Sequence, residues 1–199
     1  MRRPARGYTD SFRIIGGAHR GRRLGFPPLP GLRPTPDRVR QTVFDWLAPT
    51  IGGARCLDLY AGSGALGLEA LSRGALDATF VERERTAAEA IHGHLARLGA
   101  SNAQVITGDA LSSLATLEGA YSVVFVDPPF ESNLRHKSLV VLGASHLLAP
   151  GALVYVEGPA DEPPPLLEGW TVHRSKRAGN VGYHLLIAPF ERSASPVPS

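Results

Sequence analysis

A chain of 199 residues with 43% hydrophobic and 20% charged residues is long enough for one globular domain, and its composition excludes a disordered protein. No apolar run approaches the roughly 18 residues of a membrane-spanning helix, and no hydrophobic stretch follows the basic N-terminus as in a secretory signal. The single cysteine, Cys56, excludes an intramolecular disulfide and a cysteine-rich zinc site. We therefore expect a cytoplasmic protein without a metal site.

The net charge is only +3, but it is unevenly distributed along the chain. Residues 1–40 contain ten arginines and two acids, and the remaining 159 residues have a net charge of −5. A basic arm on an acidic body predicts a polyanionic partner such as a nucleic acid. Because the chain has only two lysines, the use of arginine could also reflect genomic composition. The arginines expected to bind phosphates are Arg20, Arg22, Arg23, Arg33, Arg38 and Arg40.

Residues 12–48 are predicted to form an N-terminal extension. Apolar residues within 12–15 and 22–26, on either side of a glycine-rich and basic segment, predict a β-hairpin. Thr35 and Pro36 then predict the start of a helix, with the threonine as N-cap and the proline in the first turn.

Residues 49–190 alternate between strand and helix patterns. Strands are expected at 55–60, 77–82, 103–107, 121–126 and 151–157, helices at 64–73, 85–98, 110–117 and 134–147, and a closing antiparallel pair at 170–176 and 181–189. This alternation is typical of a doubly wound, Rossmann-like α/β sheet. The ends of the chain, residues 1–11 and 191–199, are expected to be disordered.

A glycine motif follows the first strand of this sheet. Gly62, Gly64 and Gly67 satisfy G-x-G-x-x-G, and Glu82 ends the second strand, where a carboxylate can hold ribose hydroxyls. Taken alone, this pattern also fits a dinucleotide-dependent dehydrogenase. However, Asp58 lies four residues before Gly62, where its carboxylate would repel a pyrophosphate and would suit a cationic cofactor.

A further acid, Asp109, follows the third strand. Its carboxylate can accept a hydrogen bond from an adenine amino group, or it can cap the helix that begins at Ala110. Acids at three neighbouring strand ends favour S-adenosylmethionine, whose sulfonium and ammonium groups are positive, over NAD.

The sequence Asp127-Pro128-Pro129-Phe130 follows the apolar run 121–126, at the carboxyl end of a central strand. The Asp127 carboxylate and the Pro128 carbonyl can accept hydrogen bonds from an exocyclic amine, and Phe130 offers a face on which a base can stack. The alternative is a simple turn after a strand, since Asp-Pro often starts turns.

These motifs together resemble class I methyltransferases that act on amino groups. The upstream segments 13–17, 20–22 and 33–40 resemble a narrower group, the RsmD family, which methylates N2 of one guanine in small-subunit ribosomal RNA. The resemblance runs from about residue 12 to residue 157. It implies a seven-stranded sheet with the last strand antiparallel, and a ribosomal assembly intermediate as substrate. We take a monomer as the expected state.

The site predicted from the residues and the resemblance has two parts. The residues expected to bind S-adenosylmethionine are Asp58, Ala61, Gly62, Gly64, Glu82, Asp109 and Ala110, and the catalytic residues are Asp127, Pro128, Pro129 and Phe130. Arg38 and Arg40 could equally border the cofactor pocket.

Three other functions remain open at this point. An adenine-N6 methyltransferase acting on DNA or RNA would use the same acceptor pair, because both amines fit it. An NAD-dependent oxidoreductase is disfavoured by Asp58, and a non-catalytic RNA-binding protein by the intact set of motifs.

Overall fold

The computed structural model describes residues 8, 10–30, 32, 34–129 and 133–190. The expected disordered tails therefore lie largely outside the described residues, as do Arg33 and Phe130. Within the described part of the chain, no helix is both long and apolar enough to cross a membrane.

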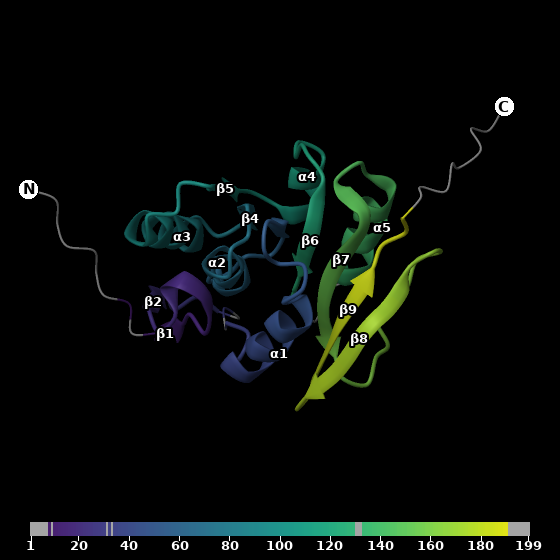
Figure 1. Ribbon diagram of the computed structural model, residues 1–199, viewed down its shortest axis with the longest axis horizontal. Coiled ribbons are helices and arrows are strands. Elements are labelled where there is room, and N and C mark those ends of the chain that lie inside the picture. The colour runs from purple at the N-terminus through teal and green to yellow at the C-terminus, as the bar shows by residue number, and fades with distance from the viewer. Residues whose placement is uncertain (1–7, 9, 31, 33, 130–132, 191–199) are drawn as a thin grey trace, which may run out of the picture.

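The centre of the molecule is a seven-stranded sheet with the order β5-β4-β3-β6-β7-β9-β8 (Figure 1). Its strands are β3 (Arg55–Asp58), β4 (Asp77–Glu82), β5 (Ala103–Thr107), β6 (Tyr121–Val126), β7 (Leu148–Pro159), β8 (Thr171–Ala178) and β9 (Val181–Ile187). Strands β3 to β7 are parallel, and β9 is antiparallel to both of its neighbours, β7 and β8. The prediction of seven strands with the last one antiparallel is confirmed.

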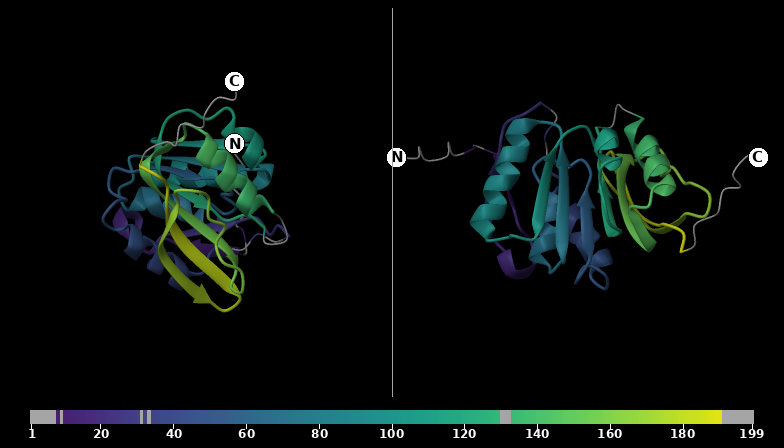
Figure 2. Two further views of the ribbon diagram at one scale, coloured as in Figure 1. Left: turned by 90° about the vertical axis from the view of Figure 1, so that its right-hand side faces the viewer. Right: turned by 90° about the horizontal axis from the view of Figure 1, so that it is seen from above.

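Within the described part of the chain, five α-helices cover the two faces of this sheet. They are α1 (Asp37–Leu47), α2 (Ala65–Ser72), α3 (Arg85–Leu98), α4 (Ala110–Leu114) and α5 (Leu134–Ala144). Apolar residues of α1, α2 and α3 pack on one face, and those of α4 and α5 pack on the other. The left panel of Figure 2 shows α5 on one side of the sheet and the purple N-terminal hairpin on the other.

The predicted bounds of the helices and strands agree best with the observed ones in the middle of the chain. The bounds of β4, β5, β6 and α3 match the predicted ranges, whereas β3 ends two residues early and β7 begins three residues before its predicted start. Strand β6 is buried nearly throughout, which explains its continuous apolar run, because a central parallel strand is covered on both faces.

The N-terminal hairpin consists of β1 (Asp10–Arg13) and β2 (Arg23–Phe26), joined through the short 3₁₀ helix η1 (Gly17–His19). Strand β1 begins and ends two residues before its predicted bounds, and β2 begins one residue after its predicted start. Four apolar side chains of the hairpin, Phe12, Ile14, Leu24 and Phe26, belong to the same core cluster as α1 and one face of the sheet. The hairpin is therefore docked on the sheet domain through a shared core.

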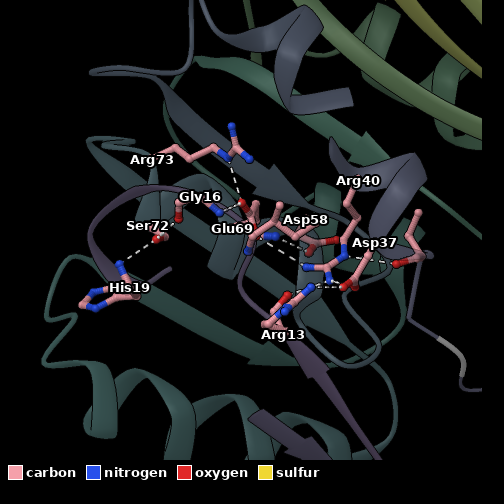
Figure 3. Close-up of polar contacts among 12 residues, drawn as sticks. Arg13, Gly16, His19, Asp37, Arg40, Asp58, Glu69, Ser72 and Arg73 are labelled. Atoms are coloured by element: carbon pink, nitrogen blue, oxygen red, sulfur yellow. Dashed lines mark hydrogen bonds and ion pairs between the residues drawn. The ribbon is translucent and has the colours of Figure 1, made fainter. Parts of the chain in front are cut away.

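A buried carboxylate fixes this docking. Glu69 in α2 is fully buried, and its two oxygens accept hydrogen bonds from the backbone N–H groups of Ile15 and Gly16, each at 2.8 Å (Figure 3). Gly17 has φ +74°, and a Cβ there would lie 1.8 Å from the carbonyl oxygen of Ser72. Gly17 is thus needed for a close backbone approach between the hairpin and α2.

The start of α1 differs from the prediction by one residue. The N-cap is Pro36, and no side chain caps the helix there. Thr35, the predicted N-cap, is instead buried, and its side chain hydrogen-bonds to Glu157 of β7. The segment before α1 therefore contacts the carboxyl end of the sheet.

Candidate active site

Strands β3 and β6 lie side by side at the point where the strand order reverses direction. Asp58 is the last residue of β3, and Asp127 directly follows β6. Ligands of open α/β sheets bind at the carboxyl ends of the strands at such a reversal. The topology thus brings the two predicted parts of the site to one edge.

The glycine loop after β3 is held by the acid that ends β4. Gly62 and Gly64 have φ values of +54° and +77°, which favour glycine, and Gly64 is the N-cap of α2. The Glu82 carboxylate accepts hydrogen bonds from the N–H groups of Gly62, at 2.6 Å, and Glu84, at 2.7 Å. Ala61 donates its N–H to the carbonyl of Val81 at 2.9 Å. Glu82 therefore fixes the glycine loop, and its predicted contact with a ribose stays a prediction.

The Asp58 carboxyl is almost completely buried and accepts a hydrogen bond from the Gly67 N–H at 3.0 Å. Burial raises its pKa to about 7, with the nearby Glu82 adding to the effect and the Gly67 hydrogen bond opposing it. A positive group that binds beside this carboxyl would lower its pKa and favour the ionised form.

Asp109 is exposed and caps α4. Its carboxylate accepts hydrogen bonds from the Ser112 N–H at 2.9 Å and the Ser112 hydroxyl at 3.0 Å, and these bonds lower its pKa. Ala110 is buried at the first position of the same helix. The capping alternative for Asp109 is thus observed, and the exposed carboxylate still lies at the edge that contains Asp58.

Asp127 lies at the carboxyl end of β6, followed by the buried Pro128 and the exposed Pro129. Its pKa is raised well above the usual range of aspartate by desolvation, then by the charges of Glu157 and Asp58. Phe130, the fourth residue of the motif, lies outside the described residues.

Glu157 is a member of this cluster that the sequence analysis missed. It is 5% exposed near the end of β7, next to β6, and accepts a hydrogen bond from the Tyr155 hydroxyl at 2.5 Å. Burial raises its pKa, and the hydrogen bonds from Tyr155 and Thr35 oppose that rise. The rule that selected Asp127, an acid at the end of a buried strand, would also have selected Glu157.

The linker before α1 covers the glycine loop. A Cβ at Gly62 would lie 2.9 Å from the Leu32 side chain, so the loop and the linker are in close contact. Beside this contact is a hollow lined by Asp10, Phe26, Pro28, Leu29, Pro30, Leu32 and Pro34. The linker, predicted only as a connection, therefore forms a wall next to the candidate cofactor site.

Asp58 and Glu157 are buried and Asp127 is half-buried. None of these three carboxyl groups forms an ion pair with a cationic side chain within the described residues. Buried acids without a counter-charge fit a ligand that brings positive charge. This arrangement suits S-adenosylmethionine and disfavours a dinucleotide, whose pyrophosphate is negative. Within the described part of the chain, no cluster of histidine, cysteine and acidic side chains could hold a metal ion.

The arginines predicted to bind RNA are separated by the fold. Arg20, Arg22, Arg23 and Arg38 are exposed, whereas Arg33 lies outside the described residues. The hairpin tip with Arg20 lies against the end of α2, where the His19 N–H donates to the Ser72 hydroxyl at 2.9 Å. Since α2 runs away from the carboxyl edge of the sheet, the tip lies at the opposite edge from Asp127.

The prediction that Arg40 binds RNA phosphates is wrong. Its side chain is fully buried, where it pairs with Asp37 at 2.6 Å and with Glu69 at 3.5 Å (Figure 3). It also donates to the backbone carbonyls of Arg13 and Thr35. Arg40 therefore joins α1 to the hairpin and α2, and it is not accessible to a nucleic acid.

The comparison with known proteins agrees with this geometry. The sequence model of the family "Conserved hypothetical protein 95" matches residues 12–187. Ribosomal RNA small subunit methyltransferase D of Escherichia coli K12 is 47% identical over 186 residues, which cover 93% of this chain and 94% of that protein. The chain belongs to this family.

Two further matches support the assignment. The Haemophilus influenzae protein of the same name is 44% identical over 177 residues, covering 87% of this chain and 92% of that protein. The solved structure of the Escherichia coli protein yhhF has a TM-score of 0.85 at 46% identity, and the match covers 92% of this chain and 100% of that one. The predicted RsmD resemblance and the class I methyltransferase sheet are thus confirmed.

Proposed function

We propose that this protein is an S-adenosylmethionine-dependent methyltransferase of the cytoplasm that modifies the exocyclic N2 amine of a guanine in small-subunit ribosomal RNA. The observation that carries the proposal is the Asp127 carboxyl group, which lies at the end of β6 beside the buried acids Asp58 and Glu157. The names of the family's curated members support ribosomal RNA as the substrate. A monomer acting on a ribosomal assembly intermediate is part of the same proposal.

S-adenosylmethionine, when bound, supplies the methyl group that the amine takes up. Asp58, Asp109 and Glu82 provide carboxylates at three neighbouring strand ends. Gly62 and Gly64 keep side chains out of the loop between them, so that a ligand can approach the backbone. We assign Asp58 to the positive part of the cofactor, Glu82 to its ribose and Asp109 to its adenine, with Ala61 and Ala110 lining the same surface.

The Asp127 carboxylate and the Pro128 carbonyl are proposed to accept the two hydrogens of the guanine amine, while Phe130 stacks on the base. These bonds orient the nitrogen lone pair and favour the developing positive charge on nitrogen. Glu157 stabilises the same charge and raises the proton affinity of Asp127, which is the first candidate to receive the proton that leaves the amine.

RNA binding is assigned to the exposed arginines of the N-terminal extension. Arg38 lies in the first turn of α1, three residues after Thr35, which contacts Glu157. It is therefore the best placed of them to bind a phosphate close to the target base. Arg20, Arg22 and Arg23 would bind more distant phosphates, which suits a large RNA substrate.

The direct test is methyl transfer from radiolabelled S-adenosylmethionine into small-subunit particles and naked rRNA from a strain lacking the protein, with DNA as the comparison. Nucleoside mass spectrometry of the product distinguishes N2-methylguanosine from N6-methyladenosine. Asp127→Ala should lower turnover by about 10²–10⁴ and leave cofactor affinity nearly unchanged. Labelling of DNA alone, or unchanged turnover in the variant, would refute the proposal.

A further inference from the structure

Two in-register glycines lie near the carboxyl end of β7. Gly158 of β7 pairs with Gly182 of β9, and both are buried. Neither has a positive φ, so the backbone does not require glycine at these positions. A glycine in the interior of a strand with ordinary backbone angles often marks a place where another group approaches closely.

The group above Gly158 is the guanidinium of Arg135. A Cβ at Gly158 would lie 1.4 Å from Arg135 Nη1, and a Cβ at Gly182 would lie 3.2 Å from His184 Nε2. Arg135 comes from the first turn of α5, and His184 comes from β9. The two glycines thus form a floor beneath two nitrogen-bearing side chains.

Both nitrogens lack a hydrogen-bond partner among the described residues. Arg135 Nη1 and His184 Nε2 are buried and unpaired, and His184 as a whole is 6% exposed. His184 Nδ1 lies 2.9 Å from the Ser175 hydroxyl. When that hydroxyl donates to Nδ1 of the neutral ring, the ring's own N–H is on Nε2. Arg135 and His184 then present two buried donors that need an acceptor.

The positive charges near these two donors favour an anion as their acceptor. Arg135 is cationic, and the exposed Arg177 is in register with Gly182. Arg135 also lies in the first turn of α5, near the partial positive charge of the helix N-terminus. The Arg135 Nη2 atom already pairs with the Glu162 carboxylate at 2.5 Å, which leaves the other arm of the guanidinium for a second oxygen anion.

Gly158 and the two side chains above it lie at the same edge of the sheet as Asp127. Val126, the residue before Asp127, is in register with Val156, and Gly158 follows two residues later on the adjacent strand. An enzyme that takes a base out of its stack must also hold the backbone of the flanking nucleotides. We propose that Arg135 and His184, above Gly158 and Gly182, bind a backbone phosphate of the RNA strand that carries the target base.

This inference rests on the proposed function, and RNA binding tests it separately from methyl transfer. The dissociation constant of the full-length protein, saturated with S-adenosylhomocysteine, is measured against small-subunit rRNA from a strain lacking the protein over a range of KCl concentrations. Arg135→Gln should raise the dissociation constant about tenfold. It should also reduce the slope of log K against log salt by about 0.7–0.9, which corresponds to one phosphate contact.

Two variants separate phosphate binding from a structural role of Arg135. Glu162→Gln frees the guanidinium and should tighten RNA binding, which a purely structural ion pair would not do. Gly158→Ala keeps every charge but displaces Arg135, and should weaken binding as Arg135→Gln does. The matched controls are Arg55→Gln and Asp77→Asn, which remove the charges of an ion pair of 2.9 Å at the opposite edge of the sheet. Neither should change the salt slope.

The inference would be overturned if Arg135→Gln left the salt slope of RNA binding unchanged, or if Glu162→Gln left the affinity for rRNA unaltered. If Arg135→Gln does not fold, the result with Glu162→Gln decides. Millimolar inorganic phosphate could instead stabilise the protein against heat in a way that depends on Arg135, while the salt slope for RNA stays unchanged. That result would identify a site for free phosphate and would also overturn the inference. If the wild-type protein transfers methyl groups to rRNA while the slope is unchanged, only this inference fails. If it binds rRNA without methylating it, the proposed function fails.

Discussion

Arg40 Nη1 lies 3.5 Å from Glu69 Oε2, and the side chains of both residues are completely buried. Glu69 also accepts a hydrogen bond from the Arg73 Nε at 2.7 Å, in addition to the two backbone N–H groups of the hairpin. One carboxylate thus joins α1, α2 and the N-terminal hairpin. The basic extension is therefore a built-in part of the methyltransferase domain in the described structure.

The buried ion pair predicts a large effect of removing its positive partner. Arg40→Met should lower the free energy of unfolding by about 3–5 kcal/mol, because it leaves part of the Glu69 charge uncompensated. Arg38→Met, on the exposed side of the same helix, should change it by less than about 0.5 kcal/mol. Urea unfolding measures both, and equal stability of the two variants would show that the pair is not structural.

The contact between Glu82 and the glycine loop predicts a specific loss of cofactor affinity. Glu82→Gln removes the negative charge of the carboxylate that accepts hydrogen bonds from the Gly62 and Glu84 N–H groups. Because these bonds fix the glycine loop, S-adenosylhomocysteine should bind about tenfold more weakly in isothermal titration. The control is Glu84→Gln, since the Glu84 side chain is 52% exposed and lies outside the loop. Equal affinities in the two variants would argue against a role of Glu82 in the cofactor site.

The raised pKa of Asp58, about 7 against an ordinary 3.8, predicts how stability depends on pH. Between these two values the folded protein keeps a proton that the unfolded chain releases, so this group's contribution to stability falls as pH rises from about 4 to about 7. Asp58→Asn removes the contribution of this group to the pH dependence, so its stability relative to wild type should rise over that window.

Thermal denaturation of the ligand-free protein at several pH values measures this effect of Asp58. Asp109→Asn is the control, because hydrogen bonds lower the pKa of Asp109 and the asparagine can still cap α4. It should show no such gain. Asp58→Asn should also bind S-adenosylmethionine more weakly, because it lacks the negative charge that we assign to the positive part of the cofactor.

Glu157 predicts the pH dependence of methyl transfer. Its negative charge helps to raise the pKa of Asp127, and the proposed mechanism needs the ionised Asp127. As the pH is lowered, activity should therefore be lost at a higher pH than an ordinary aspartate would give. In single-turnover assays Glu157→Gln should shift this loss to lower pH, whereas Glu168→Gln, which removes an exposed carboxylate, should not. The same pH of activity loss in wild type and both variants would exclude an effect of Glu157 on the pKa of Asp127.

Much of the candidate site could be predicted from local sequence. Asp58, Glu82, Asp109 and Asp127 each follow or end a strand that is recognisable by its apolar residues. Because the carboxyl ends of parallel strands meet at one edge, their meeting follows from the strand–helix alternation alone. Glu157 was accessible to the same reasoning, and it was missed because its strand carries no motif after the acid.

The exposure of the arginines could not be predicted in the same way. Arg38 and Arg40 are two residues apart on one helix, yet the first is exposed and the second is buried. The difference depends on Glu69, which lies 29 residues further along the chain, and on the hairpin that packs over it. Composition identified a basic segment, but the direction of each side chain depended on how α1 packs.

The sequence by itself determined the doubly wound sheet and the row of acids at its carboxyl edge, since both depend on periodicity and on residues next to strand ends. The tertiary structure alone decided that Arg40 is internal, that Leu32 covers the glycine loop, and that Arg135 and His184 lie over two paired glycines. The physical reason is that these contacts join residues distant in the chain, where burial and unpaired hydrogen-bonding groups appear only after the elements pack together.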